Sequence, residues 1–294
     1  MSDDPRDETG PSKTVEEDAS DWASLANLDF PLNVYALALG LGQGYVEALH
    51  YGLFETPSEA GAPSQAGAPS HAEVPEQVLH RDSGPDLALA QARATDRLLA
   101  QLPPAPARVL EVGIGLGKTL RRLSLEGYRV EGITPDSHQV AMARHTLPHV
   151  PVEEGRFECA SRPPGSLDVV LFQESAQYID REVVLARSFE WLCVGGLLII
   201  MDEVPSAEVP EWRASSERLG YRERAFVDYT AEAAPSVDVL VRSIETHRAE
   251  IESRLGLSPV RLYELVAELK RRRAAYRLGR HRYVLFHWEK KGPK

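Results

Sequence analysis

The segment Arg108–Leu120 reads RVLEVGIGLGKTL and decides the fold of this 294-residue chain. Its first residues, up to Glu111, form an apolar run of the kind found in a buried strand. The run leads into Gly113, Gly115 and Gly117, and a helical pattern follows. A strand, a glycine loop and a helix in this order predict a ligand-binding turn at the end of a parallel strand.

Two nucleotide-binding motifs come close to this loop without matching it. A nicotinamide fingerprint needs glycines at its first, third and sixth positions, and the sixth position holds Lys118. A Walker loop needs four residues before its Gly-Lys-Thr, whereas only three separate Gly113 from Gly117. The strand LLIIMDE, Leu197–Glu203, nevertheless resembles the acidic strand that holds magnesium in such enzymes. A P-loop nucleotide hydrolase therefore stays as the second hypothesis.

An acidic residue followed by Gly-x-Gly-x-Gly resembles the first motif of class I S-adenosylmethionine-dependent methyltransferases. The matching residues are Glu111, Gly113, Gly115 and Gly117. Because this cofactor carries no phosphate, the glycines would permit close backbone approach and the carboxylate would bind its ammonium group. The resemblance implies a Rossmann-like methyltransferase fold with S-adenosylmethionine as cofactor. The alternative is a tight strand-to-helix turn that binds nothing.

The second strand ends in GITPDSHQ, where many methyltransferases place an Asp or Glu on the ribose hydroxyls. Thr134 occupies that position here. This resembles a subgroup that includes cyclopropane fatty acid synthases and sarcosine-type methyltransferases, in which a Thr and a Gln five residues later line the ribose pocket. The subgroup implies cofactor contacts for Thr134 and Gln139. The alternative is that Thr134 and Ser137 cap the next helix while Gln139 faces water.

Two further segments resemble the same subgroup. HYGLF, beginning at His50, resembles its amino-terminal lid segment, which implies a cofactor contact for Tyr51; the alternative is an amphipathic aromatic at a helix end. Near the carboxyl end, Tyr276, Gly279 and Tyr283 match a related helix, glycine and final strand. The resemblance covers roughly residues 33–290, apart from a low-complexity insertion.

The segment FQESAQYI, starting at Phe172, resembles the part of methyltransferases that faces the transferred methyl group. It implies a cofactor contact for Gln173. Cyclopropane synthases carry a Glu-His pair in this segment that helps to hold bicarbonate, and Gln177 and Tyr178 stand there instead, so cyclopropanation loses support. Between the third and fourth strands, the resemblance implies Glu158 and Cys159 as neighbours of adenine.

A methyl group on a sulfonium is already activated, so catalysis requires mainly an in-line approach and exclusion of water. A base is needed only for an acceptor that is protonated at the working pH. The catalytic candidates are Glu174, Tyr178 and His50, with Glu203 as a fourth; each is individually more often a structural residue, and a carboxylate there could instead bind a cationic amine. Asp202 and Glu203 lack an evident third ligand, so we predict no metal.

The wider pattern alternates strands with helices, which predicts an α/β fold with a mostly parallel seven-stranded sheet and helices on both faces. After Pro205, short polar segments precede a strand and two long helical stretches. Ser258, Pro259 and Gly279 mark the ends of the second stretch, whose apolar stripe starts at Leu262. The expected strands are Arg108–Val112, Arg129–Ile133, Val152–Cys159, Leu167–Phe172, Gly196–Met201, Arg222–Val227 and Tyr283–Trp288.

Four segments follow from composition and periodicity. Residues 1–20 are rich in Asp, Glu, Ser and Pro and are expected to be disordered. Residues 21–55 are expected to form a helical lid, and residues 56–80, which carry GAPS twice, a low-complexity loop. Residues 81–294 then form the methyltransferase domain, with a helical insertion at about 229–280 before the last strand.

The charge balance and composition limit the classes of binding partner that we expect. Asp and Glu number 44 against 33 Lys and Arg, a net charge of −11, which gives no general reason to bind nucleic acid. The two cysteines lack metal-ligand spacing and fit a cytoplasmic setting, and no apolar run is long enough to span a membrane. The basic stretch Lys270–Arg282 is interpreted as a solvated face; alternatively Arg271 or His281 contacts an acidic substrate or a carrier protein.

The leading hypothesis is methyl transfer to O, N or C of a small molecule in secondary metabolism, as in natural product biosynthesis. The third hypothesis, after the nucleotide hydrolase, is a methyltransferase fold repurposed for a step such as cyclisation. The sequence leaves the acceptor and the oligomeric state undetermined.

Overall fold

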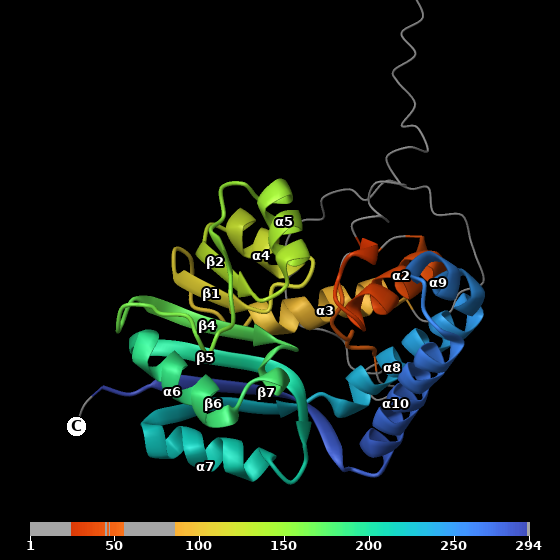
Figure 1. Ribbon diagram of the computed structural model, residues 1–294. Helices are drawn as coiled ribbons and strands as arrows, with labels where there is room; N and C mark the ends of the chain where they lie inside the picture. Colours follow the sequence, from red (N-terminus) through yellow and green to blue (C-terminus); the bar gives the residue numbers. More distant parts are fainter. Residues whose placement is uncertain (1–24, 45, 47, 56–85, 293–294) are drawn as a thin grey trace, which may run out of the picture.

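A computed structural model describes residues 25–44, 46, 48–55 and 86–292. A seven-stranded sheet with the order β3-β2-β1-β4-β5-β7-β6 runs through the molecule (Figure 1). The strands β1 to β5 are parallel, and β7 is antiparallel to both of its neighbours. Their bounds are β1 Arg108–Val112, β2 Arg129–Thr134, β3 Val152–Glu154, β4 Leu167–Gln173, β5 Leu192–Pro205, β6 Tyr221–Asp228 and β7 His281–Lys290.

All seven predicted strands are present, so the α/β prediction is confirmed. The third strand was predicted too long. It ends at Glu154 rather than Cys159, and the chain then turns, with the backbone N–H of Cys159 donating to the carbonyl of Arg156 at 3.0 Å. Glu158 and Cys159 therefore do not lie on a strand.

Helices cover both faces of the sheet, because successive strand side chains point to opposite sides. Val109 packs with one apolar cluster, and its neighbour Leu110 packs with the other. The first face carries α3 Leu87–Leu99, α4 Lys118–Leu125 and α5 Ser137–Thr146. The second carries α6 Arg181–Trp191 and α7 Val209–Leu219. The helix α7 lies where only short polar segments were expected. One side of this helix is buried, chiefly through Trp212.

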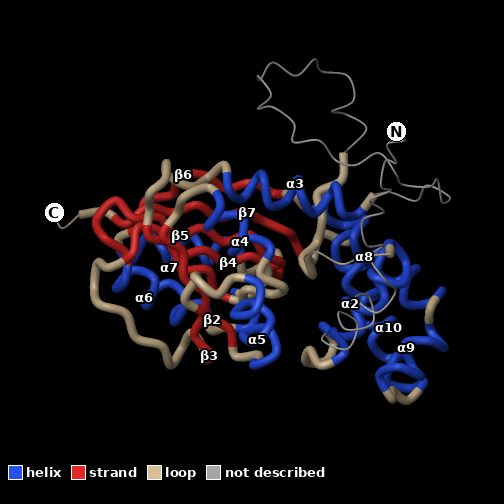
Figure 2. The backbone as a smooth tube through the Cα atoms, turned by 90° about the horizontal axis from the view of Figure 1, so that it is seen from above, coloured by secondary structure: helices blue, strands red, loops and turns tan. Residues whose placement is uncertain are grey.

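A helical lobe stands beside the sheet (Figure 2). It consists of α2 Leu32–Gln43, α8 Thr230–Thr246, α9 Arg248–Leu255 and α10 Pro259–Arg277. The last three form the predicted insertion between β6 and β7. The hydroxyl of Ser258 accepts from the backbone N–H of Arg261 at 3.3 Å, and Gly279 has a φ of 65° just beyond the helix, as the end signals of α10 predicted. None of the described helices is long and apolar enough to cross a membrane.

The predicted amino-terminal lid is only partly helical. After α2, the residues Ala48–Phe54 run without helix and are mostly buried. The backbone N–H of Leu53 donates to Ala90 on α3 at 2.8 Å, and that of Phe54 donates to Glu232 on α8 at 2.9 Å. This segment is therefore pinned between α3 and α8. The predicted tail at residues 1–20 and low-complexity loop at 56–80 lie outside the described residues.

Candidate active site

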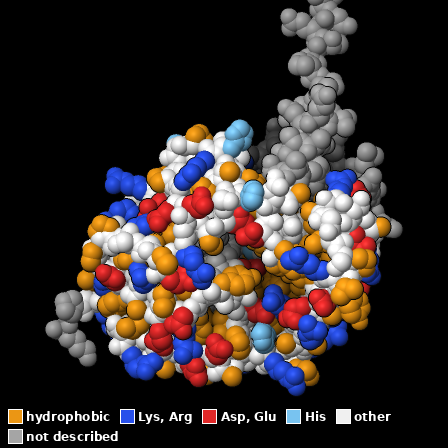
Figure 3. Space-filling model, in the orientation of Figure 1, with side chains coloured by type: hydrophobic (Ala, Val, Ile, Leu, Met, Phe, Trp, Pro, Cys, Tyr) orange, Lys and Arg blue, Asp and Glu red, His pale blue; other side chains and the backbone are white. Residues whose placement is uncertain are grey.

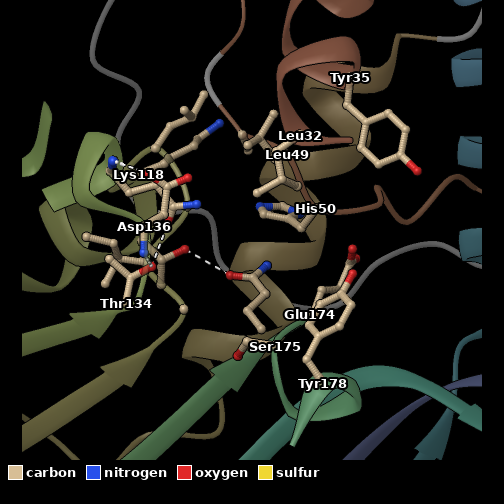
Figure 4. A pocket seen from close by; sticks show the side chains of 18 of the residues that line it. Leu32, Tyr35, Leu49, His50, Lys118, Thr134, Asp136, Glu174, Ser175 and Tyr178 are labelled. Atoms are coloured by element: carbon tan, nitrogen blue, oxygen red, sulfur yellow. Dashed lines mark hydrogen bonds between the residues drawn. The ribbon is translucent and has the colours of Figure 1, made fainter. Parts of the chain in front are cut away.

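A cavity of about 260 Å³ opens at the carboxyl ends of β1, β2, β4 and β5. Its walls also come from the segment Ala48–Tyr51, α2 and α10. The surface is hollowed between the sheet and the helical lobe (Figure 3). The lining side chains gather on two sides of this hollow, with Lys118 and Thr134 on one and Glu174 and Tyr178 on the other (Figure 4). Ligands of open α/β sheets bind at this edge, so the cavity is the candidate active site.

The glycine loop turns its backbone toward this cavity. The φ angles of Gly113, Gly115 and Gly117 are 76°, 52° and 77°, a region that side chains disfavour. A Cβ on Gly113 would lie 2.4 Å from the Cβ of Ser175. A Cβ on Gly115 would have no atom of the protein within 4 Å, and Gly115 lines the cavity. The loop thus leaves a cradle that a ligand can approach closely.

Glu111 lies at the end of β1, beneath the loop, and is 2% exposed. Its Oε2 atom is buried without a hydrogen-bond partner. Burial raises the pKa of its carboxyl to about 8. A buried acid without a partner is unfavourable in the free protein, so this position suits a cationic or donor group of a ligand.

A second unpartnered group lies on β4. The Nε2 of Gln173 is buried without a partner, while its Oε1 accepts from the hydroxyl of Thr119 at 2.9 Å. Both residues line the cavity. The orientation of the Gln173 amide is therefore fixed, with its donor left for a ligand.

Thr134 and Gln139 also meet in the cavity, where the Thr134 hydroxyl donates to Oε1 of Gln139 at 2.8 Å. Gln139 is 5% exposed and does not face water. The group that caps α5 is Asp136, whose Oδ1 accepts from the backbone N–H of His138 at 2.8 Å and of Gln139 at 3.1 Å. Capping by Thr134 and Ser137 is therefore wrong. Asp136 lines the cavity as well, although sequence reasoning missed it.

His50 lines the cavity, and both of its ring nitrogens already have hydrogen-bond partners. Its Nδ1 lies 2.8 Å from the carbonyl oxygen of Tyr51, so this nitrogen carries the proton. Its Nε2 lies 3.3 Å from the hydroxyl of Thr95. Burial lowers the pKa of His50 to about 4. A neutral imidazole held at both nitrogens serves to position the segment and is poorly suited to accept a proton.

Glu174 adopts a left-handed conformation with a φ of 57°, which no other described non-glycine residue shares. Its Oε1 accepts from the backbone N–H of Tyr51 at 2.6 Å and from the hydroxyl of Tyr283 at 2.7 Å. The rings of Tyr51 and Tyr283 lie 5.9 Å apart. Burial raises the pKa of the Glu174 carboxyl to about 8. Strained backbone of this kind concentrates at functional sites.

Two acids at the end of β5 have different environments. The Oδ2 of Asp202 accepts from the backbone N–H of Ala176 at 2.7 Å and of Gln177 at 3.1 Å, so Asp202 holds the turn after β4. Glu203 lines the cavity and accepts from the hydroxyl of Tyr276 at 2.6 Å. In the described part of the chain, no group of three or more His, Cys, Asp or Glu side chains is placed to hold a metal ion.

Residues 110–200 match the family described as methyltransferase domain. An uncharacterized methyltransferase of Mycobacterium tuberculosis is 28% identical over 120 residues, which span 41% of this chain and 45% of the relative. One of Bacillus mycoides is 28% identical over 100 residues, spanning 33% and 47%. The chain thus spans less than half the length of the curated relatives it matches.

Solved structures share the fold over a longer stretch. A putative sarcosine dimethylglycine methyltransferase from Galdieria sulphuraria has a TM-score of 0.68 at 13% identity, covering 88% of this chain and 98% of that one. The cyclase SpnF has a TM-score of 0.66 at 17% identity, covering 87% and 93%. Geranyl diphosphate C-methyltransferase from Streptomyces coelicolor has a TM-score of 0.59 at 18% identity, covering 95% and 100%.

Residues 110–200 therefore form a methyltransferase domain by sequence, and the chain shares its fold with solved methyltransferase structures. The cavity gathers most of the side chains that the sequence singled out. They are His50, Tyr51, Glu111, Gly113, Gly115, Thr134, Gln139, Gln173, Glu174 and Tyr178.

Three of the predicted site residues of the methyltransferase domain do not line the cavity. Glu158 accepts from Arg156 at 2.9 Å and Cys159 is exposed, because the chain has already left β3. Gly117 shapes the loop from outside, as the residue that precedes α4. The site also holds Arg272, which sequence reasoning assigned to a solvated face. Its position three residues after Leu269 continues the apolar stripe of α10, and this spacing was the available signal.

Proposed function

We propose that this protein binds S-adenosylmethionine in the cavity and transfers its methyl group to a small-molecule acceptor. The observation that carries the proposal is the buried, unpartnered Oε2 of Glu111 at the glycine loop. An ammonium group is the partner that such a carboxyl lacks, because the pair would share a charge-assisted hydrogen bond.

The other residues on this side of the cavity fit the rest of the cofactor. Gly115 offers open backbone for its amino acid portion. Thr134, Gln139 and Asp136 present hydroxyl, amide and carboxylate groups that suit ribose hydroxyls. The donor of Gln173 is left over for a ligand acceptor atom. When bound, S-adenosylmethionine supplies a methyl group made electrophilic by its sulfonium.

We propose Glu174 as the general base for an acceptor that must lose a proton. Its carboxyl lines the cavity, and a pKa of about 8 suits proton transfer near neutral pH. Tyr51 and Tyr283 orient it through its Oε1. Tyr178, which is 71% exposed, lies at the cavity rim, where it would contact the acceptor or close over it.

The nucleotide hydrolase hypothesis fits the same residues less well. In a P-loop enzyme, the hydroxyl after the lysine and the acid of the neighbouring strand hold magnesium. Here both carboxyl oxygens of Asp202 accept from backbone N–H groups, Oδ2 from Ala176 and Gln177 and Oδ1 from Glu203. This acid therefore holds the turn after β4 and is poorly placed to bind a cation.

The setting that we propose is cytoplasmic small-molecule metabolism, such as natural product biosynthesis. The cavity volume supports a small acceptor, and both cysteines, Cys159 and Cys193, are free thiols, as in a reducing compartment. The single observation that favours a repurposed activity such as cyclisation is the likeness to the cyclase SpnF. Methylation produces S-adenosylhomocysteine at each turnover, whereas cyclisation does not.

The test is calorimetry with S-adenosylmethionine and S-adenosylhomocysteine, with ATP and magnesium as the comparison. We expect both sulfur compounds to bind and ATP not to bind. A matched pair of variants, Glu111→Gln and the exposed Glu154→Gln, locates the site, because only the first should weaken binding. Failure of both sulfur compounds to bind would refute the proposal. Binding of ATP with magnesium would favour the nucleotide hydrolase hypothesis instead.

A further inference from the structure

Arg272 extends from α10 into the cavity that also holds Glu174 and Tyr51. We infer that Arg272 recognises a carboxylate group on the methyl acceptor, so that the substrates are small organic acids. This inference rests on the proposed methyltransferase function and concerns the half of the cavity away from the glycine loop.

The direction of this side chain sets it apart from the neighbouring cations of α10. Arg271 lies 2.6 Å from Glu268, Arg273 lies 2.8 Å from Asp238, and Lys270 lies 2.7 Å from Glu245. Arg273 and Lys270 pair with acids of α8 and Arg271 pairs within α10, and all three pairs are at ordinary ion-pair distances. Arg272 instead follows the apolar stripe of α10 and lines the cavity, and its side chain is 26% exposed.

The contacts of the Arg272 guanidinium are loose. Its Nε lies 3.3 Å from Oε1 of Glu203, and its Nη1 lies 3.4 Å from the hydroxyl of Tyr51. Within the described part of the chain, these are the polar contacts of this guanidinium, and both are long for charge-assisted bonds. Glu203 already has two shorter partners, at 2.6 Å from Tyr276 and 2.8 Å from Nδ1 of His281. The guanidinium can therefore turn toward a ligand while Glu203 keeps its hydrogen bonds.

The charge around Arg272 favours a monoanion. A guanidinium binds a carboxylate through two parallel N–H donors in one plane. A cationic amine would be repelled by Arg272. A phosphate carries up to two negative charges and would meet Glu203, whose carboxylate lies within 3.3 Å of the same guanidinium. A carboxylate brings the single charge that this surrounding accommodates best.

The rest of this half indicates what the acid is attached to. Leu32, Tyr35 and Tyr178 line the cavity with apolar and aromatic surface, and Figure 4 shows them around the space next to Glu174. A carboxylate on Arg272 would leave the body of the acceptor against these side chains. We therefore expect an aromatic or aliphatic acid that carries its nucleophilic atom some distance from the carboxylate.

The experiment compares four probes that share one ring and differ in their polar group: phenylacetate, phenylacetamide, phenethylamine and phenyl phosphate. Dissociation constants are measured by ligand-observed NMR on the full-length protein saturated with S-adenosylhomocysteine. We expect phenylacetate to bind at least about 10-fold more tightly than the other three, the size of a charge-assisted pair. Arg272→Gln should abolish this preference, Arg272→Lys should retain part of it, and the outward-facing Arg271→Gln should leave it unchanged.

Binding of S-adenosylhomocysteine to Arg272→Gln shows that this variant is folded. Equal binding of the acid and the amide, an unchanged preference in Arg272→Gln, or no binding of phenylacetate would overturn the inference. Tighter binding of phenyl phosphate would replace the carboxylate with a phosphate and would also overturn it. The same titrations on the unloaded protein test Arg272 even if S-adenosylhomocysteine does not bind, so the failure of this inference and that of the proposed function are distinguishable.

Discussion

Replacing Glu111 with Gln is expected to stabilise the unbound protein at alkaline pH while weakening its binding of S-adenosylmethionine. The native pKa of about 8 exceeds the ordinary value for Glu. The native state therefore holds its proton more tightly than the unfolded state, and stability is lost as the pH rises from the unfolded pKa to the native pKa. Between pH 5 and pH 8 this loss amounts to about 4 kcal/mol, from about 1.4 kcal/mol for each of the three pH units.

The same substitution also changes the free energy of cofactor binding. Loss of the charged hydrogen bond should weaken S-adenosylmethionine binding by about 1 to 3 kcal/mol. Because the ammonium favours the ionised carboxyl, the wild-type protein should release a proton on binding, and its affinity should rise between pH 6 and pH 7.5. The Gln variant should show neither effect through this site.

The assay is urea unfolding at pH 5, 6.5 and 8 for the wild type, Glu111→Gln and the control Glu154→Gln, together with calorimetry in two buffers of different ionisation enthalpy. The stability difference between wild type and Glu111→Gln should change with pH, and Glu154→Gln shows the effect of the same substitution at an exposed position outside the cavity. A pH-independent difference combined with unchanged affinity would refute the reasoning, since Glu111 would then be neither strained by burial nor part of the site.

Three further substitutions test the site and its support. Gly115→Ala places a methyl group in the open cavity and should weaken S-adenosylhomocysteine binding about 10-fold. It should also lower the free energy of unfolding by about 1 kcal/mol, because the φ angle of this residue is 52°. Wild-type affinity in calorimetry would exclude the loop from the site. Glu174→Gln should lower turnover about 100-fold or more with S-adenosylhomocysteine affinity within about threefold, and wild-type turnover should rise toward pH 8 as the base ionises; a flat pH profile in a product assay would contradict this. Gly52→Ala would put a Cβ 2.5 Å from that of Ala90 and should cost about 2 kcal/mol or more in chemical unfolding; wild-type stability would show that the segment yields.

The strands were predictable because their apolar runs are continuous and local. Val109 and Leu110 pack on opposite faces, and a sheet buried on both sides needs apolar residues at both positions. The helix α7 was missed because its sequence, VPEWRASSERL, is mostly polar and buries chiefly Val209 and Trp212. The end of β3 was misplaced because strand length there depends on pairing with β2, which the chain's own pattern does not encode.

Within the site, the residues next to the glycine loop were predictable because one motif contains them. Arg272 was not, because the same stretch of Lys and Arg suits both a solvated face and an inward side chain until the helix phase is fixed. The pinning of Tyr51 depends on partners more than 120 residues away, such as Glu174 and Arg272. Such pairings come from the tertiary fold, and no local spacing indicates them.

The contacts of Tyr51 also bear on the order in which the protein matures. Its partners are Glu174, which directly follows β4, Arg272 on α10 and Tyr283 on β7, so the wall of the cavity closes only when β7 has joined the sheet. During synthesis, the glycine loop emerges long before that strand and has to wait for it. Contacts this distant in sequence form late and slowly. A growing chain would therefore gain its affinity for the ligand in one of its last folding steps. The ligand would stabilise the finished protein without guiding the early steps of folding.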